Sequence, residues 1–426
     1  MLSLVDANNF YCSVERSFNP FLEGKPVIVL SNGDGCVVAR SNEAKAIGIT
    51  MGAPYFQLAE LIREHNIYVY SSNYTLYGCA SARLMALLGR FVEEVEVNSI
   101  DEAFLDLTGY ESVYPDLRYF ARTIREQVNE GIGVPVSVGI APTKSLTKVA
   151  NWYAKRLEAV EGVFLLDTPT AIQDALSDFS VKELWGVGGR YKSLLNRNDI
   201  RTAAQFTALP DDWLRHNMTV NGLRLKYELL GTPCRLLDTE PPVRKSFCAA
   251  PSFGQLIPDK ETMTEALLTY LARVAERLRK QHSAARVMTV FLHTNRFKRS
   301  ANGELAKYYY NSQTLHLPHP SSSTQELAHY AAAALDRIFR FGYAYQKVGI
   351  ILSDFVPDNF RQPGLFTNVA DERLLKLSRV MDRINTRHGR DRVRVAGQGF
   401  SPTWPMKQQW LSPCYTTRWK DILTAH

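Results

Sequence analysis

Residues 98–107 read NSIDEAFLDL, and they place two acids, Asp101 and Glu102, side by side between apolar runs. The flanking stretches 92–100 and 103–109 are rich in strand-forming residues, and we expect them to pair as a hairpin with the acids at its tip. Neighbouring side chains of a strand point to opposite faces, so one carboxylate would be buried unless the pleat breaks at this tip. Because burying an unpaired carboxylate is costly, we expect cations near this pair.

A third acid, Asp6, ends a predicted N-terminal strand, and a helix is expected to begin just after it, near Asn8 or Asn9. Sites in α/β sheets are built at strand ends, so we expect Asp6 to approach the acid pair. Three converging carboxylates repel one another unless divalent cations lie among them. Oxygen ligands without histidine or cysteine nearby favour Mg²⁺, and paired Mg²⁺ ions are typical of phosphoryl transfer. The alternative is that Asp101 and Glu102 form only a solvated turn.

The composition is that of an ordinary globular protein. The 426 residues are 45% hydrophobic and 22% charged, and a chain of this length is typical of about two to four domains. The net charge of +7 and the pI near 9.0 favour a polyanionic partner. The six cysteines form no CxxC pair, which favours free thiols in a reducing cytosol. Neither a signal-peptide core nor a run long enough to cross a bilayer is present, so we expect no membrane partner.

The first 165 residues alternate strand-like and helix-like stretches, which predicts an α/β domain. Apolar runs at 26–30 and 36–39 flank a Gly-containing turn and predict a hairpin. A helical pattern follows at 75–91.

Later stretches predict a different organisation. Short helices are expected over 168–232, and the polar, Pro-containing stretch 238–246 suits a linker. Beyond it, strands at 287–294 and 347–355, separated by two amphipathic helices, predict an α+β domain. The residues after about 355 are rich in Pro, Gly, Gln and Arg, and we expect them to be only partly ordered.

A predicted helix at 143–156 carries Lys144, Lys148 and Lys155 on one side and apolar residues on the other. Such a stripe is either a solvated face or, over a carboxylate–metal cluster, a site for a triphosphate.

The stretch LWGVGGR contains Gly186, Gly188 and Gly189 and predicts a turn between helices. Exposed backbone N–H groups at a helix start suit a nucleic-acid phosphate. The alternative is that these glycines only allow two helices to pack closely.

Several stretches resemble the UmuC-like group of Y-family (translesion) DNA polymerases, the catalytic subunits of the DNA polymerase V type. They are DANNFYCSVE, LSNGDGCVVARSNEAKAIGI, SSNYTLY, SIDEAFLDLTG, SVGIAPTKSLTKVAN, LWGVGGR, AGQGF and MKQQWLSPCYTTRW, and they span nearly the whole chain. The resemblance implies a right-hand polymerase built from α/β and α+β domains. The implied parts are a palm (1–20 and 72–165), small fingers (21–71), a helical thumb with a helix-hairpin-helix (166–237), a linker (238–246), a little finger (247–355) and a C-terminal tail (356–426).

The resemblance also implies an activity, namely error-prone, DNA-directed translesion DNA synthesis in the bacterial SOS response, without proofreading. Asp6, Asp101 and Glu102 would be the catalytic residues that hold two Mg²⁺ ions, helped by the backbone carbonyl of Ala7. The primer 3′-hydroxyl would attack the α-phosphorus of a dNTP, and pyrophosphate would leave.

Five residues would contact the incoming nucleotide by the same resemblance. Lys45 and Lys155 would bind the triphosphate, and Tyr11 would be the steric gate whose ring collides with a ribose 2′-hydroxyl. Phe10 packs beside Tyr11. Asn42 departs from the pattern, since many relatives carry a tyrosine there.

The resemblance places the DNA contacts outside the palm. The thumb glycines Gly186, Gly188 and Gly189 would approach the phosphate backbone. Asp199 replaces the glycine usual before Ile200, and aspartate tolerates the left-handed conformation such a hairpin needs. A basic cluster in the little-finger region would grip the duplex: Arg286, Arg296, Lys298 and Arg299.

Low accuracy is expected from the size of the fingers, and the partners are implied by the resemblance. The fingers, 21–71, are short and contain several small residues, so we expect them to enforce base-pair shape poorly and fidelity to be low: Gly33, Gly35, Ala39, Ser41 and Ala44. In RQPGLF, three residues fit a peptide that binds the sliding clamp: Gln362, Leu365 and Phe366. The implied partners are primer-template DNA, dNTP, the sliding clamp, a UmuD-like processed dimer and a RecA filament, in the bacterial cytoplasm.

Two other functions remain open at this point. A polymerase-shaped DNA-binding accessory would lack catalysis, but such homologues usually lose the acids that this chain retains. A nucleotidyl cyclase also uses a palm with paired metals, but it would need neither the Gly-x-Gly thumb nor the clamp peptide.

Overall fold

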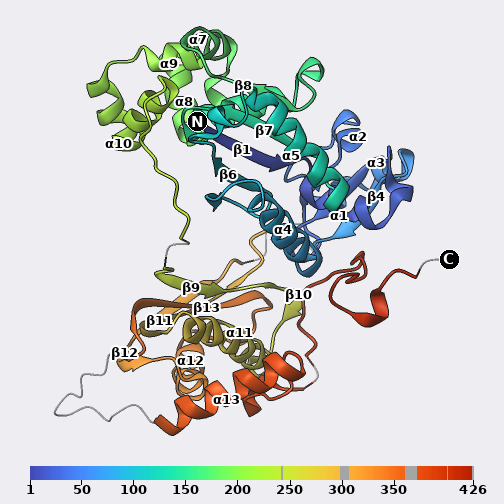
Figure 1. The fold of residues 1–426 in the computed structure, drawn as a ribbon. Helices are drawn as coiled ribbons and strands as arrows, with labels where there is room; N and C mark the ends of the chain where they lie inside the picture. Colours follow the sequence, from blue (N-terminus) through green and yellow to red (C-terminus); the bar gives the residue numbers. More distant parts are fainter. Residues whose placement is uncertain (241–242, 298–306, 360–371, 401, 425–426) are drawn as a thin grey trace. The chain divides into compact units, whose positions relative to one another are not determined.

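The computed structural model describes residues 1–240, 243–297, 307–359, 372–400 and 402–424, and the chain divides into two units (Figure 1). Unit 1 comprises Met1–Ser31, Gly35–Pro241 and Trp410–His426, and unit 2 comprises Asn32–Asp34 and Pro242–Gln409. The chain therefore leaves unit 1, forms unit 2 and returns to unit 1 at its C-terminal end. Within the described ranges, no helix combines the length and apolarity needed to span a bilayer.

A five-stranded sheet in the order β5-β6-β1-β7-β8 forms the centre of unit 1. Strand β1 lies between β6 and β7 and pairs antiparallel with both. The expected hairpin around the acid pair is confirmed, since β5 and β6 pair antiparallel across it. The strands are β1 (Leu2–Ala7), β5 (Val95–Val97), β6 (Glu102–Asp106), β7 (Val136–Ala141) and β8 (Val163–Leu165).

Helices cover both faces of this sheet. On one face, alternate residues such as Val5 and Val138 contribute to a core that the sheet forms with three helices: α1 (Phe10–Phe18), α4 (Tyr74–Leu88) and α5 (Leu117–Ile132). Figure 1 shows α5 running across the sheet. On the opposite face, α6 (Lys144–Ala154) packs against β1 and β7, and the amide of its Asn151 donates hydrogen bonds to the carbonyls of Leu4 and Ser137. Since Asp6 alternates with Val5, it lies on the α6 face.

Gly139 of β7 allows α6 to lie close to the sheet. A Cβ atom at this position would be 2.3 Å from the Asn151 backbone nitrogen and 2.5 Å from the Thr147 backbone oxygen. No side chain fits at such distances, so the glycine fixes how closely the lysine-bearing helix approaches the strands.

Two smaller parts complete unit 1. The predicted hairpin forms with a third strand, giving a sheet in the order β3-β2-β4 with its own core. Its elements are β2 (Val27–Leu30), β3 (Val37–Arg40), β4 (Tyr68–Ser71), α2 (Asn42–Ala46) and α3 (Ala59–Glu64). The predicted short helices also form and share a core with α6: α7 (Pro169–Asp178), α8 (Gly189–Arg197), α9 (Ala203–Thr207) and α10 (Asp211–Leu229).

Unit 2 contains a sheet in the order β10-β13-β11-β12, with β9 paired to β13, and helices α11 and α12 packed against it. The expectation of two helices between the strands at 287–294 and 347–355 is wrong. Among the described residues between them there is one helix, and a long edge strand, β12, precedes it. The elements are β9 (Ser246–Ala249), β10 (Ser252–Ile257), α11 (Lys260–Lys280), β11 (Ser283–Thr294), β12 (Tyr310–Ser321), α12 (Thr324–Ile338) and β13 (Tyr345–Pro357).

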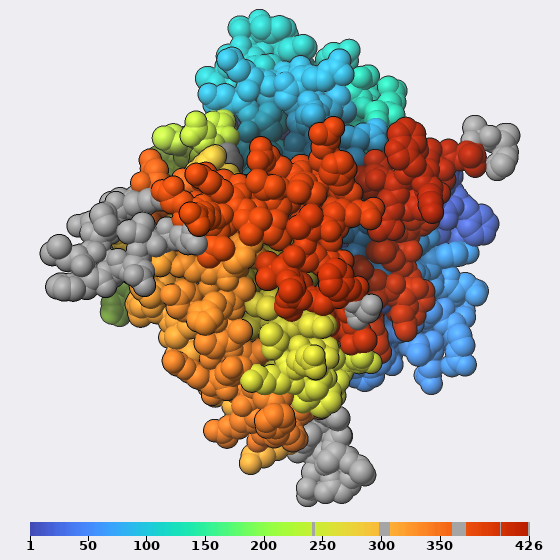
Figure 2. Space-filling view, turned by 90° about the horizontal axis from the view of Figure 1, so that it is seen from below, coloured from blue at the N-terminus to red at the C-terminus, as the bar shows by residue number. Residues whose placement is uncertain are grey.

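The stretch expected as one partly ordered tail, 356–426, has two different parts among its described residues. Helix α13 (Glu372–His388) packs on α12 in unit 2, and the arginine side chain of Arg279 in α11 forms an ion pair with Asp382 at 2.6 Å. The residues from Trp410 onward belong to unit 1. Figure 2 shows this C-terminal segment, in dark red, against the blue N-terminal residues.

A buried carboxyl group joins elements of unit 1. Glu15 on α1 is 2% exposed, and its Oε1 accepts hydrogen bonds from the Tyr77 hydroxyl at 2.6 Å and the Ser412 hydroxyl at 2.9 Å. Burial raises the pKa of Glu15 to about 7, against the opposing effect of these two hydrogen bonds. The folded protein therefore favours the protonated carboxyl group at a pH where an exposed glutamate is ionised.

We expect Gly139→Ala to lower the free energy of unfolding by several kcal/mol, roughly 2–4, because the added methyl group overlaps backbone atoms of α6. Gly131→Ala in α5 is the matched control. Its Cβ would meet only Leu87 Cδ2 at an ordinary 3.5 Å, so its effect should be neutral or slightly stabilising. Urea unfolding measures both, and equal stabilities for the two variants would contradict the close approach at Gly139.

We expect Glu15 to make stability depend on pH in one direction. The unfolded carboxyl group ionises near 4.5 and the folded one near 7, so its stabilising contribution is complete below about pH 4.5 and is lost as the pH rises through about 7. The stability of wild type relative to Glu15→Gln should then fall by up to about 3 kcal/mol between pH 5 and 8. Urea unfolding at both pH values measures this, with the exposed Glu60→Gln as control. A difference that does not change with pH would refute the prediction.

Candidate active site

The pairing of β1 with β6 brings the three predicted acids to one end of the sheet. In this register Asp6 lies directly opposite Glu102. The next backbone hydrogen bond joins Ala7 to Asp101: the Ala7 N–H donates to the Asp101 carbonyl at 2.8 Å. Because opposite residues of an antiparallel pair project to the same face, Asp6 and Glu102 both project toward α6.

Two lysines from α6 and its C-terminal end form ion pairs with two of these carboxylates. Lys155 Nζ lies 2.6 Å from Asp6 Oδ1, and Lys148 forms an ion pair with Glu102. Lys144, predicted to lie on the same stripe, does not join them. Lys144 is 4% exposed, forms an ion pair with Glu96 and donates a hydrogen bond to the Leu236 carbonyl at 2.8 Å. It therefore binds the stretch of chain that follows α10 and not the acids of the site.

The hairpin tip supplies further polar partners to the acids. The Ser99 hydroxyl donates to the Asp101 carboxylate, and the Asn98 amide donates to Glu102. The tip is therefore an ordered, hydrogen-bonded turn, and its acids face the rest of the site. The alternative of a merely solvated turn is not what the structure shows for Glu102, which is paired with a helix across the sheet.

Negative charge accumulates around Asp6. Burial raises its pKa to about 6; Lys155 opposes this shift, and the neighbouring charges of Glu102 and Asp101 reinforce it. Among the described residues, no three acidic, histidine or cysteine side chains are already gathered in a geometry that would hold a metal ion. The all-oxygen donor set and the mutual repulsion at Asp6 nevertheless fit a hard divalent cation, because such a cation would relieve the repulsion.

Tyr11 lies beside the acids in an aromatic cluster. Its ring stacks on Tyr77 with centroids 4.4 Å apart and planes 15° apart, and it meets Tyr74 edge to face at 6.0 Å. Burial and the charges of Tyr74 and Asp101 raise the pKa of Tyr11. The ring centroids of Phe10 and Tyr11 are 5.8 Å apart, and Phe10 is buried in the core of the sheet. Phe10 thus packs beside Tyr11, as expected.

Asn42 and Lys45 meet a residue that sequence reasoning missed, Asn9. Lys45 Nζ donates to Asn9 Oδ1 at 2.6 Å and to Asn42 Oδ1 at 3.1 Å, and the Asn9 amide donates to Asn42 Oδ1 at 3.0 Å. Asn9 begins α1 in the left-handed conformation, with φ 50°. The Asn8–Asn9 pair was a usable signal, since asparagine tolerates the left-handed conformation better than most residues.

Other cations surround Lys45. Burial lowers the pKa of Lys45, and so do the charges of Arg40, Lys155 and Arg156. A group of like charges held this near one another repels itself and attracts a polyanion.

Three of the five small residues named in the predicted fingers, 21–71, lie in the interior of this part. Ala39, Ser41 and Ala44 are buried, and the Ser41 hydroxyl caps α2 by accepting from the Ala44 N–H. They pack the three-stranded sheet rather than forming a permissive lid. Gly33 and Gly35, at the turn, lie outside this core, and it is the small size of this part that would make it enforce base-pair shape poorly.

The glycines of the helical part have space around them. A Cβ atom at Gly186, Gly188 or Gly189 would meet nothing within 4 Å, so close helix packing does not account for these glycines. Gly186 has φ 94°, and α8 begins at Gly189. Asp199 adopts φ 57°, which confirms that aspartate takes the left-handed conformation here.

The predicted basic cluster is only partly within the described residues. Arg286 is exposed on β11, and Arg296 lies over the Phe297 ring just after that strand. Lys298 and Arg299, and the clamp-peptide residues Gln362, Leu365 and Phe366, lie outside the described residues.

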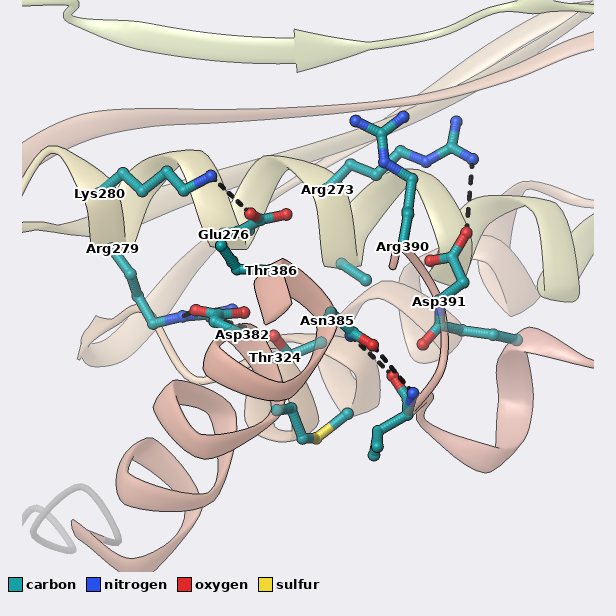
Figure 3. A pocket seen from close by; sticks show the side chains of 14 residues that line it. Arg273, Glu276, Arg279, Lys280, Thr324, Asp382, Asn385, Thr386, Arg390 and Asp391 are labelled. Atoms are coloured by element: carbon teal, nitrogen blue, oxygen red, sulfur yellow. Dashed lines mark hydrogen bonds and ion pairs between the residues drawn. The ribbon is translucent and has the colours of Figure 1, made fainter. Parts of the chain in front are cut away.

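A separate pocket of about 240 Å³ in unit 2 contains none of the predicted site residues. Figure 3 shows that its charged side chains largely pair with one another: Lys280 with Glu276, Arg279 with Asp382, and Arg273 with Asp391. The last two pairs join α11 to α13 and to the turn after it, and the first lies within α11, which indicates a structural role.

Comparison with known families assigns most of the chain. Residues 5–151 match the impB/mucB/samB family, and residues 244–365 match the impB/mucB/samB family C-terminal domain. Residues 376–425 match a domain of unknown function, DUF4113. The last match covers most of α13 in unit 2 and most of the C-terminal segment in unit 1.

Individual proteins agree with this assignment. The chain is 40% identical to protein UmuC of Salmonella typhimurium (strain LT2), over 99% of both chains. It is 28% identical to DNA polymerase IV 2 of Bacillus subtilis (strain 168), over 94% of this chain and 96% of that one. A solved Y-family DNA polymerase chimera of Dbh and Dpo4 superposes with a TM-score of 0.64 at 22% identity, covering 83% of this chain and 99% of that one.

The structural likeness confirms the expected fold of a Y-family DNA polymerase. The full-length identity to UmuC confirms the expected group. The chain therefore belongs to the impB/mucB/samB family and is a UmuC-like DNA polymerase of the Y-family.

Proposed function

We propose that this error-prone translesion polymerase extends a DNA primer by two-metal nucleotidyl transfer at Asp6, Asp101 and Glu102. One observation carries the assignment of these residues. The β1–β6 register sets Asp6 opposite Glu102, and the Ala7–Asp101 backbone hydrogen bond brings the third acid to the same end of the sheet.

The three carboxylates would hold two Mg²⁺ ions together with the backbone carbonyl of Ala7. When bound, these ions would make the primer 3′-hydroxyl more acidic and offset charge on the leaving pyrophosphate. Asp6, Asp101 and Glu102 act as ionised ligands, so no general base is required of Glu102. Burial is the main cause of the raised pKa of Asp6, and the charges of Glu102 and Asp101 add to it, so a cation bound here would favour the ionised carboxylate.

Metal binding would release Lys155 from Asp6. Its Nζ would then be available to a triphosphate, beside Lys45 and the cations that surround it. Asn9 and Asn42 hold the Lys45 ammonium group by their amide oxygens, which orients it without neutralising its charge. Tyr11 would face the sugar of the same nucleotide.

The DNA would be bound by the thumb and the little finger. The uncrowded glycines of the thumb allow the phosphate backbone to approach their N–H groups, and the little-finger arginines add positive charge. One solved relative of the same fold is an insertion ternary complex of Dbh DNA polymerase, which supports DNA and dNTP as partners of this chain. By the likeness to UmuC we further propose a UmuD-like dimer as partner, and the sliding clamp and a RecA filament as further candidates.

We expect Asp101→Asn to lower the rate of primer extension at least about 100-fold, because it removes a charged metal ligand. The affinity for primer-template DNA should stay within about twofold of wild type. Glu126→Gln, on α5 across the sheet, is the matched control and should extend normally. Extension is measured with dNTPs and Mg²⁺, with and without an accessory UmuD-like dimer. DNA binding without extension by wild type under all these conditions would favour a non-catalytic accessory.

We expect Lys45→Ala to raise the KM for dNTP by about tenfold, because it removes a charge-assisted contact to the triphosphate. Asn9→Ala should raise it less, since it leaves the charge in place but no longer orients it. Single-nucleotide incorporation kinetics measure both effects, and Arg63→Ala on α3 controls for loss of a cation in the fingers. A KM that Lys45→Ala leaves unchanged would remove Lys45 from the nucleotide site.

A further inference from the structure

The C-terminal segment, residues 410–424, is built into the palm and fingers. The Ser71 N–H donates to the Trp410 carbonyl at 2.9 Å, and the Trp410 N–H donates to the Ser71 hydroxyl at 3.1 Å. Leu411 forms a parallel bridge to Ser71 at the end of β4, and the Trp410 ring lies 4.7 Å from Tyr55 of the fingers. Backbone pairing and an aromatic contact thus fix where the segment enters unit 1.

Ser412 and Asn73 then tie the segment to the start of α4. The Asn73 amide donates to the Ser412 carbonyl at 3.0 Å and to its hydroxyl at 3.1 Å. The Asn73 side-chain oxygen accepts from the Leu76 N–H at 3.2 Å and so caps α4. Ser412 is 6% exposed and Asn73 is 3% exposed, so this is an interior connection.

A chain of three contacts leads from Ser412 to Tyr11. The Ser412 hydroxyl donates to Glu15 Oε1 at 2.9 Å, and the Tyr77 hydroxyl donates to the same oxygen at 2.6 Å. The Tyr77 side chain is fully buried, and its ring stacks on Tyr11. Tyr77 is therefore the surface against which the Tyr11 ring rests, and Glu15 holds Tyr77 by its hydroxyl group.

We propose that the C-terminal segment, through Ser412, Glu15 and Tyr77, sets the position of Tyr11 and thereby the discrimination between deoxyribonucleotides and ribonucleotides. This inference rests on the proposed function, in which Tyr11 faces the sugar. Ser412, Glu15 and Tyr77 are positioning residues, since none of them touches the nucleotide. The inference gives the terminal part of the domain of unknown function a role in substrate selection.

The position of the Tyr11 ring matters because a steric gate works only within a narrow range of positions. A ring that excludes one hydroxyl group must be held to within a fraction of an ångström, and residues packed behind it supply that precision. The edge-to-face contact with Tyr74 limits Tyr11 from a second side. The C-terminal segment has a further attachment, the Tyr415 ring stacked on Phe18 at 4.9 Å, so loss of the Ser412 hydroxyl should not release the segment.

The test compares single-nucleotide incorporation of dNTP and rNTP by the full chain carrying Ser412→Ala, Tyr77→Phe or both. We expect each single change to lower the ratio of kcat/KM for dNTP over rNTP by about three- to tenfold, mainly by a rise for rNTP. The double variant should match the larger single effect, because both changes act through the same carboxyl group. Ser412→Thr should restore discrimination, and Thr416→Ala, an exposed change on the same segment, should leave it unchanged.

Three results would overturn the proposal. One is an unchanged ratio in both single variants that still extend with dNTP. A second is a double variant whose loss is the product of the single losses, since this indicates independent effects. A third is a wild-type chain that extends with neither nucleotide under any condition, which refutes the proposed function and this inference together. Thermal unfolding of each variant shows whether a loss of discrimination comes from misfolding instead, because misfolding lowers dNTP incorporation equally.

Discussion

Compensation of two facing carboxylates, Asp6 and Glu102, at one end of a β-sheet is the constraint on which the site depends. Pairing of β1 with β6 forces Asp6 and Glu102 together, and their repulsion would oppose that register if nothing balanced it. Lys155 and Lys148 supply the balance from α6, which can approach because residue 139 is glycine. Strand register, a glycine and two lysines thus form one arrangement.

The same arrangement explains how the site can be both stable and reactive. Lysines are monovalent and flexible, so they can neutralise the acids in the free protein and give way to divalent ions with nucleotide. We propose that Lys155, once displaced from Asp6, supplies positive charge to the triphosphate. In this proposal Lys155, which pairs with Asp6, would contact the triphosphate in the nucleotide complex.

The hydrophobic periodicity and the charges of neighbouring residues predicted much of the secondary structure of unit 1 and several residues of the candidate site. The acid pair, the strand ending at Asp6 and the lysine helix could be read directly, because period and charge are local properties. Long-range polar contacts could not: Lys144 turned out to bind Glu96, and Asn9 joined Lys45 from a distant part of the chain. The edge strand β12 was missed because its polar residues are tolerated where only one neighbour pairs with it. The return of the C-terminal segment to unit 1 left no periodic signal at all.

The most direct test of the central claim is anomalous diffraction from crystals grown with primer-template, an unreactive dNTP analogue and Mn²⁺ in place of Mg²⁺. The account predicts metal peaks about 2.1–2.2 Å from carboxylate oxygens of Asp6, Asp101 and Glu102. It also predicts that Lys155 has left Asp6 for the triphosphate. Intact lysine ion pairs with no metal peak among the three acids, in a complex that holds the nucleotide, would contradict it.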